Sequence, residues 1–265
     1  MQLKLFQVDA FTSELFGGNP AAVVPLTQWL PDELMVRIAM ENNLSETVFF
    51  VPEAHASAGD FRFRWFTPSA EVDLCGHASL AAAHVLWRHL DFPGQEIRIQ
   101  SMSGPLSVTR EGDGISLDFP ARPGEPVALD PRWGAAMGAM PVAAISDRKL
   151  MLVYESREQV AALTPDMAAL SEFDHLGVIA TAPAEEAGFD FVSRFFAPKI
   201  GIPEDPATGA AHCTLIPYWA ERLGTQTLAA RQISPRGAVL RCVNRGDRVT
   251  ITGQAVTYLE GKIYL

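Results

Sequence analysis

The sequence predicts an α+β fold made of two domains of similar architecture. Short β-rich segments alternate with a few helical segments, a similar order restarts in the second half, and one short motif occurs twice. With 265 residues, the chain is long enough for one large domain or for two of ordinary size, either with a substantial core. The Pro- and Gly-containing segment "PARPGEP" at 120–126 is the predicted linker.

The first half is typical of strands placed around two helices. Alternating or β-branched runs predict strands at 3–11, 21–26, 46–52 and 61–68, and three more between 96 and 120. "GGNP" at 17–20 predicts a turn, and apolar residues at helical spacing after Pro31 predict a helix over 31–41. The segment 78–90 predicts a helix that is apolar nearly all round, which is typical of a buried helix.

The second half repeats this order. "KLMLVYE" at 149–155 and "HLGVIATAP" at 175–183 predict strands, and "TPDMAALSEF" at 164–173 predicts a helix opened by Thr164 and Pro165. A further strand in "FDFVSRFFAP" precedes "EDPATGAAHCTLIPYWAERLG", a second apolar helix that contains Pro217. Because proline lacks an N–H group, Pro217 should kink this helix or mark a missing backbone hydrogen bond.

An internal repeat links the two halves. "DFRFRWFTP" at 60–68 and "DFVSRFFAP" at 190–198 share five of nine residues at a constant offset of 130, and Gly76 then matches Gly209 at an offset of 133. Unrelated segments share about one residue in twenty, so chance does not explain the match. We assign Phe61, Phe63, Trp65, Phe191 and Phe195 to the core. The matching Arg64 and Arg194 are expected to pair with acids that hold each strand end.

The two matching glycines, Gly76 and Gly209, suggest that the repeated helices bind a ligand at their N-termini. Each glycine stands before a buried helix, whose N-terminus carries unpaired N–H groups and a partial positive charge. Two such helix heads aimed into one cleft between the domains form a site for an anion such as a carboxylate. A glycine at each head lets the backbone approach the ligand closely.

Composition excludes several classes of protein. The net charge is -10 and no dense run of Lys or Arg is present, which disfavours nucleic acid and anionic membranes as partners. The N-terminal segment lacks the features of a signal peptide, and no window approaches 18 apolar residues. Three widely spaced cysteines give no disulfide framework, so we expect a cytoplasmic protein.

Three residues are candidates for chemistry, each with a structural alternative. Glu46, at a strand start, is either a solvated turn acid or a catalytic carboxyl. Its apolar neighbours should desolvate it and raise its pKa, which suits a group that takes and returns a proton. His77 is either a structural residue near a helix start or a donor to a substrate oxygen. Asp205 is a helix cap, a catalytic partner, or both.

We predict no metal site and find no nucleotide-binding motif. Cys75 is expected to be a small buried residue. A zinc site built from Cys75, His77, His212 and Cys213 is not expected, because the Cys-x-His spacing is too short and adjacent helix residues point to different faces. Neither GxGxxG nor GxxxxGK[ST] occurs.

Four motifs together resemble the PhzF-like proteins of phenazine biosynthesis, within the diaminopimelate epimerase fold. They are "FQVDAFTSELFGGNPAAVV", "NLSETVFF", "LCGHASLAAAHVL" and "EDPATGAAHCTLIPYW". The resemblance implies two pseudo-symmetric domains, 1–118 and 119–258, each a mixed sheet wrapped around a central helix. It also implies that the final strand, 259–265, returns to the first domain. The implied activity is that of a cofactor-free isomerase, usually a homodimer, acting on a small anionic metabolite.

The resemblance also assigns roles to individual positions. Glu46 matches the family's general acid/base, and His77 and Asp205 match its two polar partners in catalysis. Substrate-binding positions in the same motifs are Asn19, Ser45, Gly76, Gly209 and Ala210.

Two positions depart from the patterns of related enzymes. Ala210 stands where the phenazine enzymes have a serine, so a hydroxyl donor is missing and the phenazine precursor is not assured as the substrate. Cys75 stands where related epimerases and proline racemases keep one of two catalytic cysteines. Their second cysteine matches Thr208, so a mechanism with two thiols is not available.

Two other functions stay open at this point. One is a hydrolase or lyase built on the same cleft, and the other is a protein that binds a metabolite without catalysis. Incorporation of solvent deuterium into a bound metabolite separates an isomerase from a binding protein, since the latter shows none.

Overall fold

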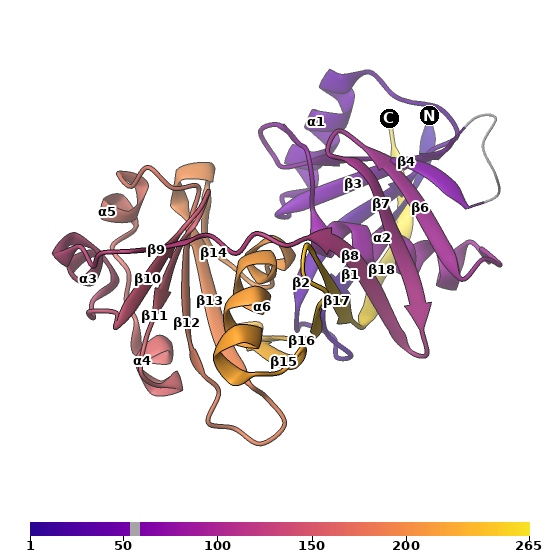
Figure 1. The fold of residues 1–265 in the computed structure, drawn as a ribbon. Helices are drawn as coiled ribbons and strands as arrows, with labels where there is room; N and C mark the ends of the chain where they lie inside the picture. The colour runs from indigo at the N-terminus through magenta and orange to yellow at the C-terminus, as the bar shows by residue number, and fades with distance from the viewer. Residues whose placement is uncertain (54–58) are drawn as a thin grey trace. The chain divides into compact units, whose positions relative to one another are not determined.

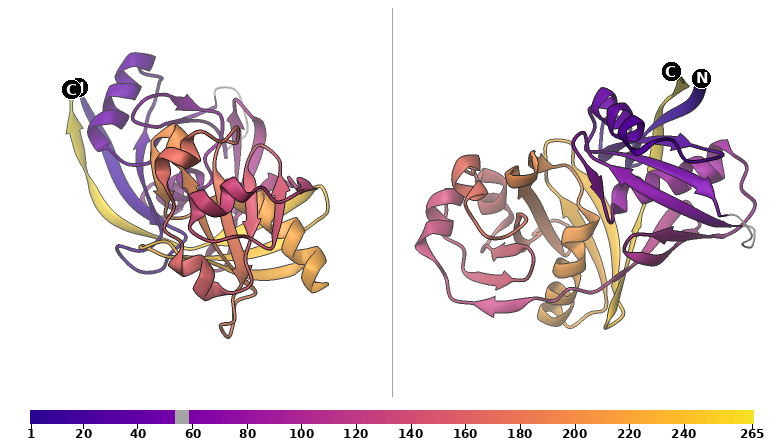
Figure 2. Two further views of the ribbon diagram at one scale, coloured as in Figure 1. Left: turned by 90° about the vertical axis from the view of Figure 1, so that its left-hand side faces the viewer. Right: turned by 90° about the horizontal axis from the view of Figure 1, so that it is seen from above.

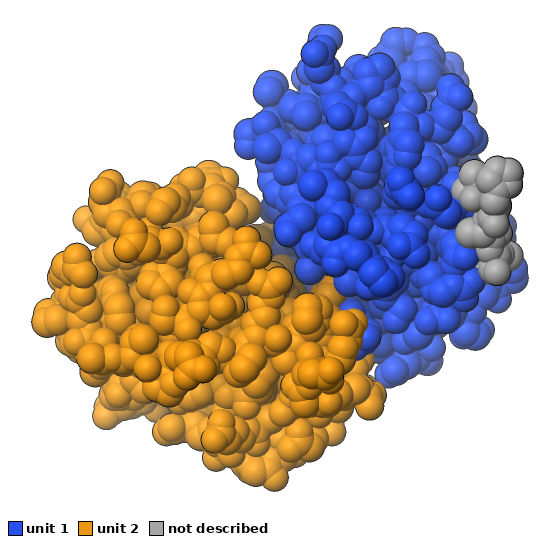
Figure 3. All heavy atoms as spheres, turned by 45° about the horizontal axis from the view of Figure 1, so that its top comes forward, with its two compact units in different colours: residues 1–118, 252–265 blue, residues 119–251 orange. Residues whose placement is uncertain are grey.

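The chain folds into two units, each built on a mixed β-sheet with helices, as the ribbon of the computed structural model shows (Figure 1). The structure describes residues 1–53 and 59–265. Unit 1 comprises Met1–Asp118 and Thr252–Leu265, and unit 2 comprises Phe119–Ile251 (Figure 3). The position of one unit relative to the other is not determined, so each unit is described by itself.

The sheet of unit 1 combines antiparallel and parallel pairs. β18 (Ala255–Tyr264), β1 (Gln2–Ala10) and β2 (Asn19–Pro25) are antiparallel neighbours, and β2 pairs in parallel with β3 (Glu46–Pro52). β4 (Asp60–Phe66) pairs antiparallel with β3 and β5 (Glu71–Val72) and parallel with β6 (Glu96–Ser101). β7 (Gly104–Glu111) and β8 (Gly114–Pro120) complete the order. The helices are α1 (Asp32–Asn42) and α2 (Gly76–His89).

The sheet of unit 2 follows the same plan. β9 (Glu125–Val127), β10 (Ala143–Ser146) and β11 (Leu150–Val153) are antiparallel neighbours, and β11 pairs in parallel with β12 (Val178–Pro183). β13 (Phe191–Ala197) pairs antiparallel with β12 and β14 (Ile202–Asp205) and parallel with β15 (Thr227–Gln232). β16 (Ala238–Asn244) pairs with β15, and β17 (Arg248–Gly253) follows. The helices are α3 (Pro131–Met137), α4 (Arg157–Ala162), α5 (Met167–Ser171), the 3₁₀ turn η1 (Pro198–Ile200) and α6 (Gly209–Leu223).

The strand pairing confirms the internal repeat. The series β1, β2, β3, β4, β6 and β7 has the same sequence of parallel and antiparallel pairs as β10, β11, β12, β13, β15 and β16. The short strands β5 and β14 occupy matching places, and each precedes the long helix of its unit. The two halves therefore fold as copies of one architecture.

Each unit has one long, buried helix. In α2 every residue except His84, Arg88 and His89 is buried, and the helix packs against β1, β2 and β3 (Figure 1). In unit 2, α6 packs against β15 and β16. Pro217 lies inside α6, and its missing N–H leaves the carbonyl of Cys213 without the usual helical donor. The N–H of Arg122 donates to that carbonyl at 2.8 Å, so the predicted gap in the helix bonding is filled from outside the helix.

The two ends of the chain lie side by side in unit 1. β18 pairs with β1 from Ala255 to Tyr264, and the views of Figure 2 show both termini at the same edge. The N–H of Leu265 donates to the carbonyl of Met1 at 2.9 Å. The compact unit begins again at Thr252, within β17, rather than after the expected boundary at residue 258, so the whole of β18 belongs to unit 1.

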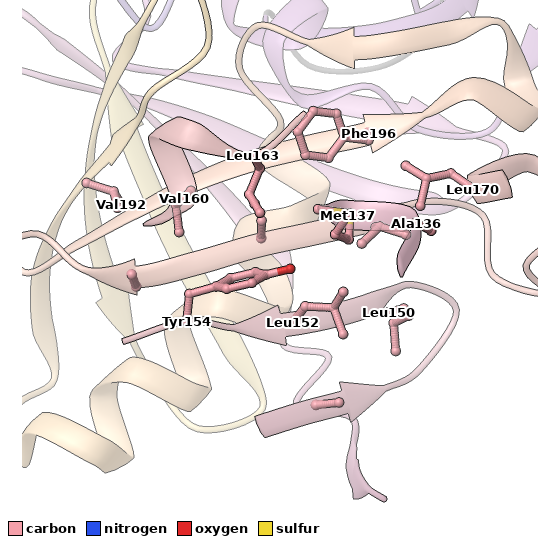
Figure 4. Packing of buried hydrophobic residues seen from close by; sticks show 14 of the residues in the cluster. Ala136, Met137, Leu150, Leu152, Tyr154, Val160, Leu163, Leu170, Val192 and Phe196 are labelled. Carbon is pink, nitrogen blue, oxygen red and sulfur yellow. The ribbon is translucent and has the colours of Figure 1, made fainter. Parts of the chain in front are cut away.

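The helices of unit 2 cover its sheet with apolar side chains. Figure 4 shows side chains of α3, α4, α5 and β11 meeting in one layer; those labelled include Met137, Val160, Leu170 and Leu152. In unit 1 a comparable cluster joins α1 to β2, β3 and β4 through Met35, Ile38, Val24, Phe49 and Phe66. Burial of these side chains supplies the main driving force for folding of each unit.

The matching arginines act as the repeat predicted. Arg64 lies 2.5 Å from Glu71 and 2.8 Å from Asp32, and Arg194 lies 2.8 Å from Glu204. Each guanidinium also lies over a ring of its own strand, Phe66 at 5.1 Å and Phe196 at 4.8 Å. The core assignment of the repeat aromatics is likewise confirmed, since Phe61, Phe63, Trp65, Phe191 and Phe195 are all buried.

Several local expectations need correction. Asn19 and Pro20 belong to β2, so the turn ends at Gly18. The helix expected over 164–173 begins at Met167 and is capped by Asp166, whose carboxylate accepts from the N–H groups of Ala168 and Ala169. α2 begins at Gly76 rather than 78. In the described part of the chain, no helix is long and apolar enough to cross a membrane.

Candidate active site

Parallel pairing of β2 and β3 brings the first group of candidates together. Ala21 lies opposite Glu46 in this pair, so Asn19 and Ser45 lie at the same end of the two strands. The hydroxyl of Ser45 donates to Oδ1 of Asn19 at 3.4 Å. Asn19 is fully buried and Glu46 is 9% exposed. Two residues far apart in the sequence thus meet because parallel strands start side by side.

The N-terminus of α2 adds the second group. His77, the second residue of the helix, is 4% exposed, and its Nε2 lies 3.2 Å from Oε2 of Glu46. Its Nδ1 lies 3.2 Å from Nδ2 of Asn19. An amide nitrogen is a donor, so Nδ1 accepts and the ring proton is assigned to Nε2, facing Glu46.

The His77 imidazole is neutral at neutral pH. Burial lowers its pKa to about 3, because a charged ring loses its hydration in this position. The 3.2 Å approach to Glu46 is therefore a close polar contact rather than an ion pair. A neutral ring with a fixed N–H can donate to an oxygen that gains negative charge during a reaction.

Cys75 completes this cluster. It is the N-cap residue of α2, and its Sγ lies 3.5 Å from Nδ1 and 4.0 Å from Nε2 of His77. A carboxyl oxygen of Glu46, the sulfur of Cys75 and a ring nitrogen of His77 all lie within 4.8 Å of one another. Cys75 is buried, as predicted, and it also contacts a candidate catalytic residue.

The unit 2 candidates gather at the N-terminus of α6. Asp205 ends β14, and Thr208, not Asp205, is the N-cap residue. The reading of Asp205 as the cap is therefore wrong. The hydroxyl of Thr208 donates to Oδ2 of Asp205, which holds that carboxylate three residues before the cap. Gly209 and Ala210 are the first two residues of the helix.

Gln232 is a component of this loop that the sequence reading missed. Its Oε1 accepts from the N–H of Thr208 at 2.9 Å, and its Nε2 donates to the carbonyl of Asp205 at 2.6 Å and to the Thr208 hydroxyl at 3.2 Å. It is 1% exposed. The signal was a polar residue on the buried face of β15, in step with Leu228 and Ala230.

At each helix N-terminus the neighbouring carboxyl comes from outside the helix: Glu46 beside His77 of α2, and Asp205 beside Thr208 of α6. Neither Cys75 nor Thr208 caps its helix with a side-chain hydrogen bond, and neither first turn contains an acidic residue. The partial positive charge of each N-terminus is therefore not offset by a nearby side-chain carboxylate from that turn.

The repeat shows that the carboxyl of Glu46, the imidazole of His77 and the thiol of Cys75 occur in one unit only. Phe66 and Phe196 are matching residues of the repeat, and they pair with Thr47 and Val178. Glu46 and Gly177 come directly before these two partners, so Gly177 is the counterpart of Glu46 in unit 2. A Cβ on Gly177 would lie 2.5 Å from the ring of Phe195, so this place has no room for a side chain.

The helix heads differ in the same way. Counted from Gly76 and Gly209, the first residues of α2 and α6, His77 corresponds to Ala210. The N-cap residue Cys75 corresponds to Thr208. Unit 2 therefore lacks counterparts of the carboxyl, the imidazole and the thiol.

The zinc set considered from the sequence is divided between the units, with Cys75 and His77 in unit 1 and His212 and Cys213 in unit 2. Nδ1 of His212 lies 2.9 Å from the carbonyl oxygen of Thr208. The thiol of Cys213 donates to the carbonyl of Gly209 at 3.7 Å. Both are thus engaged with the backbone of α6, whereas Cys75 and His77 lie with Glu46.

Comparison with known proteins places the chain among phenazine biosynthesis-like proteins. The model of that family, PhzC-PhzF, matches residues 8–261. An uncharacterised isomerase of Pseudomonas aeruginosa is 52% identical, with 100% of each chain covered. The crystal structure of a PhzF-family protein of Enterococcus faecalis superposes with a TM-score of 0.95 and 45% identity, again over 100% of each chain.

A more distant structure shows how far the fold extends. A hydroxyproline epimerase of Agrobacterium vitis superposes with a TM-score of 0.65 at 14% identity, covering 99% of this chain and 92% of that one. This likeness concerns the fold alone, and it agrees with the epimerase-like architecture predicted from the motifs.

Proposed function

The chain belongs to the phenazine biosynthesis-like family and is an isomerase of the PhzF-like type, and from this premise we propose that it moves a proton within a small carboxylic acid without a cofactor. Glu46 is the proposed general acid/base. The observation that carries the proposal is the 3.2 Å contact of Glu46 with a neutral, oriented His77, in the one unit that holds both groups.

The proposed reaction needs only one proton-carrying group. The Glu46 carboxylate removes a proton from one carbon of the substrate, and the electron pair spreads over the conjugated acid. The resulting carboxylic acid returns the proton to a second carbon, so substrate and product have the same composition. His77 donates its Nε2–H to the oxygen on which negative charge develops. Gly177 and Ala210 stand at the matching places of unit 2, so these places supply no second base, which supports a mechanism with one proton-carrying group.

The remaining candidates are proposed to bind rather than to transfer the proton. Asn19, Ser45 and Gly76 in unit 1 and Gly209 and Ala210 in unit 2 are the proposed substrate contacts, and Asp205 is the proposed polar partner. The two helix N-termini support an anionic metabolite as substrate, because their N–H groups can bind it. The loss of a hydroxyl at Ala210 supports an acid other than the phenazine precursor.

Location and assembly are part of the same proposal. The three cysteines are all free thiols, which supports a reducing compartment, and we propose the cytoplasm. We also propose a homodimer. Light scattering coupled to size-exclusion chromatography tests this. A measured mass equal to that of one chain, 28.8 kDa, would contradict the homodimer.

The test begins with the unknown substrate. Mass spectrometry of small molecules retained on the purified protein identifies candidate acids. Each candidate is then incubated with the protein in D2O. Deuterium at carbon together with an isomeric product supports the proposal. A retained acid that takes up no deuterium supports a metabolite-binding protein instead, and a product of different mass supports a hydrolase or lyase on the same fold.

A further inference from the structure

We infer that Glu46, Cys75 and His77 also form a binding site for one thiophilic divalent cation, with Zn²⁺ as the best match, and that this ion inhibits the enzyme. The inhibition rests on the proposed function of Glu46, whereas the binding does not. From the sequence no metal site is expected, because the Cys-x-His spacing is short and the adjacent His212 and Cys213 point to different faces of a helix. The fold places Cys75 and His77 beside a carboxyl instead.

The spacing of the donor atoms fits tetrahedral coordination. Zn²⁺ lies about 2.0–2.1 Å from nitrogen and oxygen ligands and about 2.3 Å from sulfur, so tetrahedral geometry separates N from O by about 3.3 Å and S from N by about 3.6 Å. Nε2 of His77 lies 3.2 Å from Oε2 of Glu46 and 4.0 Å from Sγ of Cys75. All three donor atoms fall within 4.8 Å. The sulfur–nitrogen distance exceeds the tetrahedral value by about 0.4 Å, so binding requires these side chains to draw together.

The donor types agree with the ion. A thiolate, an imidazole and a carboxylate are ligands of Zn²⁺, and three protein ligands leave a fourth position open to water or substrate. In residues 1–53 and 59–265, no other three His, Cys, Asp or Glu side chains gather this closely.

Asn19 is placed to orient the metal-bound histidine. When Nε2 binds the ion, the ring proton moves to Nδ1 and needs an acceptor. In the structure, Nδ2 of Asn19 lies 3.2 Å from Nδ1 of His77. Rotation of the Asn19 amide by half a turn would place Oδ1 at this position, where it can accept the proton of Nδ1. Ser45, 3.4 Å from Asn19, then accepts instead of donating, as a hydroxyl can. Such an outer partner is typical of metal-binding histidines.

The proton balance of binding follows from these ligands. Cys75 must lose its thiol proton to solvent, His77 keeps one proton by changing tautomer, and Glu46 binds as a carboxylate. Binding therefore releases the thiol proton of Cys75. With the ion bound, the lone pairs of Glu46 that would take up the substrate proton are engaged, and the reaction stops until a chelator removes the metal.

Cobalt provides a test with a readout besides activity. The chelator-treated full-length protein is titrated with Co²⁺, and a thiolate-to-cobalt charge-transfer band should saturate at one equivalent. Cys75→Ser should abolish the band. Cys213→Ser, a matched control at a buried cysteine outside the cluster, should retain it. Glu46→Gln should weaken binding by at least about tenfold, within the range for lost metal-site partners.

Calorimetry with Zn²⁺ in buffers of different ionisation enthalpy should show proton release on binding, and Cys75→Ser should reduce it. The inference is overturned if neither ion binds saturably at micromolar concentration, or if the cobalt band survives Cys75→Ser in a folded protein. These outcomes do not involve turnover, so they leave the isomerase proposal untouched. Conversely, deuterium exchange that persists in Glu46→Gln would overturn the proposed function and leave the metal site standing.

Discussion

The carboxyl of Glu46 is the group on which the proposed reaction depends at the scale of single residues. Glu46→Gln keeps the shape of the side chain but removes its proton chemistry. The variant should fold and bind its acidic ligand, yet lose turnover by at least about a hundredfold, the lower end of what a positioned acid/base supplies. Steady-state kinetics on the identified acid checks this.

A control carboxyl lies nearby in the sequence. Glu53 follows β3 and pairs with Arg62 at 3.2 Å on the surface. Glu53→Gln should leave turnover unchanged, because an exposed pair of this kind contributes little. Near-normal turnover of Glu46→Gln would contradict the mechanism.

Cys75 is expected to matter for metal sensitivity and not for catalysis. Its counterpart in the repeat is Thr208, which is not a thiol base, so no pair of cysteines exists for a two-base reaction. Cys75→Ala should keep turnover within a few-fold of wild type while losing inhibition by Zn²⁺. The two quantities are measured in the same assay, and loss of all turnover would revive a thiol mechanism.

His212 makes the stability of unit 2 depend on pH. Burial lowers its pKa to about 4, although its bond to the carbonyl of Thr208 acts in the opposite direction. The unfolded chain takes up this proton below about pH 6.5, whereas the folded chain does not until about pH 4. The contribution is therefore fully present above pH 6.5 and is lost as pH falls from 6.5 to 4.

His212→Asn tests this because an amide can still donate to Thr208 but does not titrate. Between pH 4 and 6.5, the slope of unfolding free energy against pH should fall by up to about 1.4 kcal/mol per pH unit. Urea denaturation at several pH values measures it. An unchanged slope would contradict the assignment, and a residual slope is expected because burial also lowers the pKa of His84 to about 4.

At the scale of elements, one glutamine organises the segment between β14 and α6. Gln232 makes three hydrogen bonds: one to the carbonyl of Asp205, one to the N–H of Thr208 and one to the hydroxyl of Thr208. Gln232→Leu leaves a buried backbone N–H and carbonyl without partners, which costs about 1–3 kcal/mol for each such group. The free energy of unfolding should fall accordingly.

The kinetic constants of Gln232→Leu separate a role of Gln232 in positioning the substrate contacts from a role in stability alone. Gln232→Leu should raise KM for the acid more than it lowers kcat, because the displaced segment carries proposed substrate contacts at Gly209 and Ala210. Gln100→Leu, at an exposed glutamine on β6 of the other repeat, serves as the control and should change neither constant. Equal losses in both variants would contradict the positioning role.

At the scale of the whole molecule, β18 ties the last residues of the chain to the first. Residues 259–265 pair with β1 from Gln2 to Gln7, so deleting them exposes the long edge of β1. Hydrogen exchange of β1 amides should then become faster, because their opening requires less free energy. Amides of β11 to β13 in unit 2 provide the internal control and should exchange as in the full chain.

Much of the architecture was determined by the sequence itself. Alternating apolar residues marked β4, short β-rich runs marked β3 and β12, and longer apolar runs after Gly76 and Gly209 marked the two buried helices. These features are local, since burial of a strand or helix face depends on residues two to four positions apart. The repeat was visible for the same reason, because each copy must bury the same faces.

Only the tertiary structure decided which of these residues meet. Glu46 meets Cys75 and His77 because α2 packs on the sheet beside the start of β3. Strand register places Gly177 at the position in unit 2 that corresponds to Glu46. The hydrogen bonds of Gln232 likewise join β15 to residues far away in the sequence. Register joins residues far apart in the sequence, and a shift of one residue would turn each side chain to the opposite face. Local patterns do not encode that choice; it is made when the strands pair and the helices pack together.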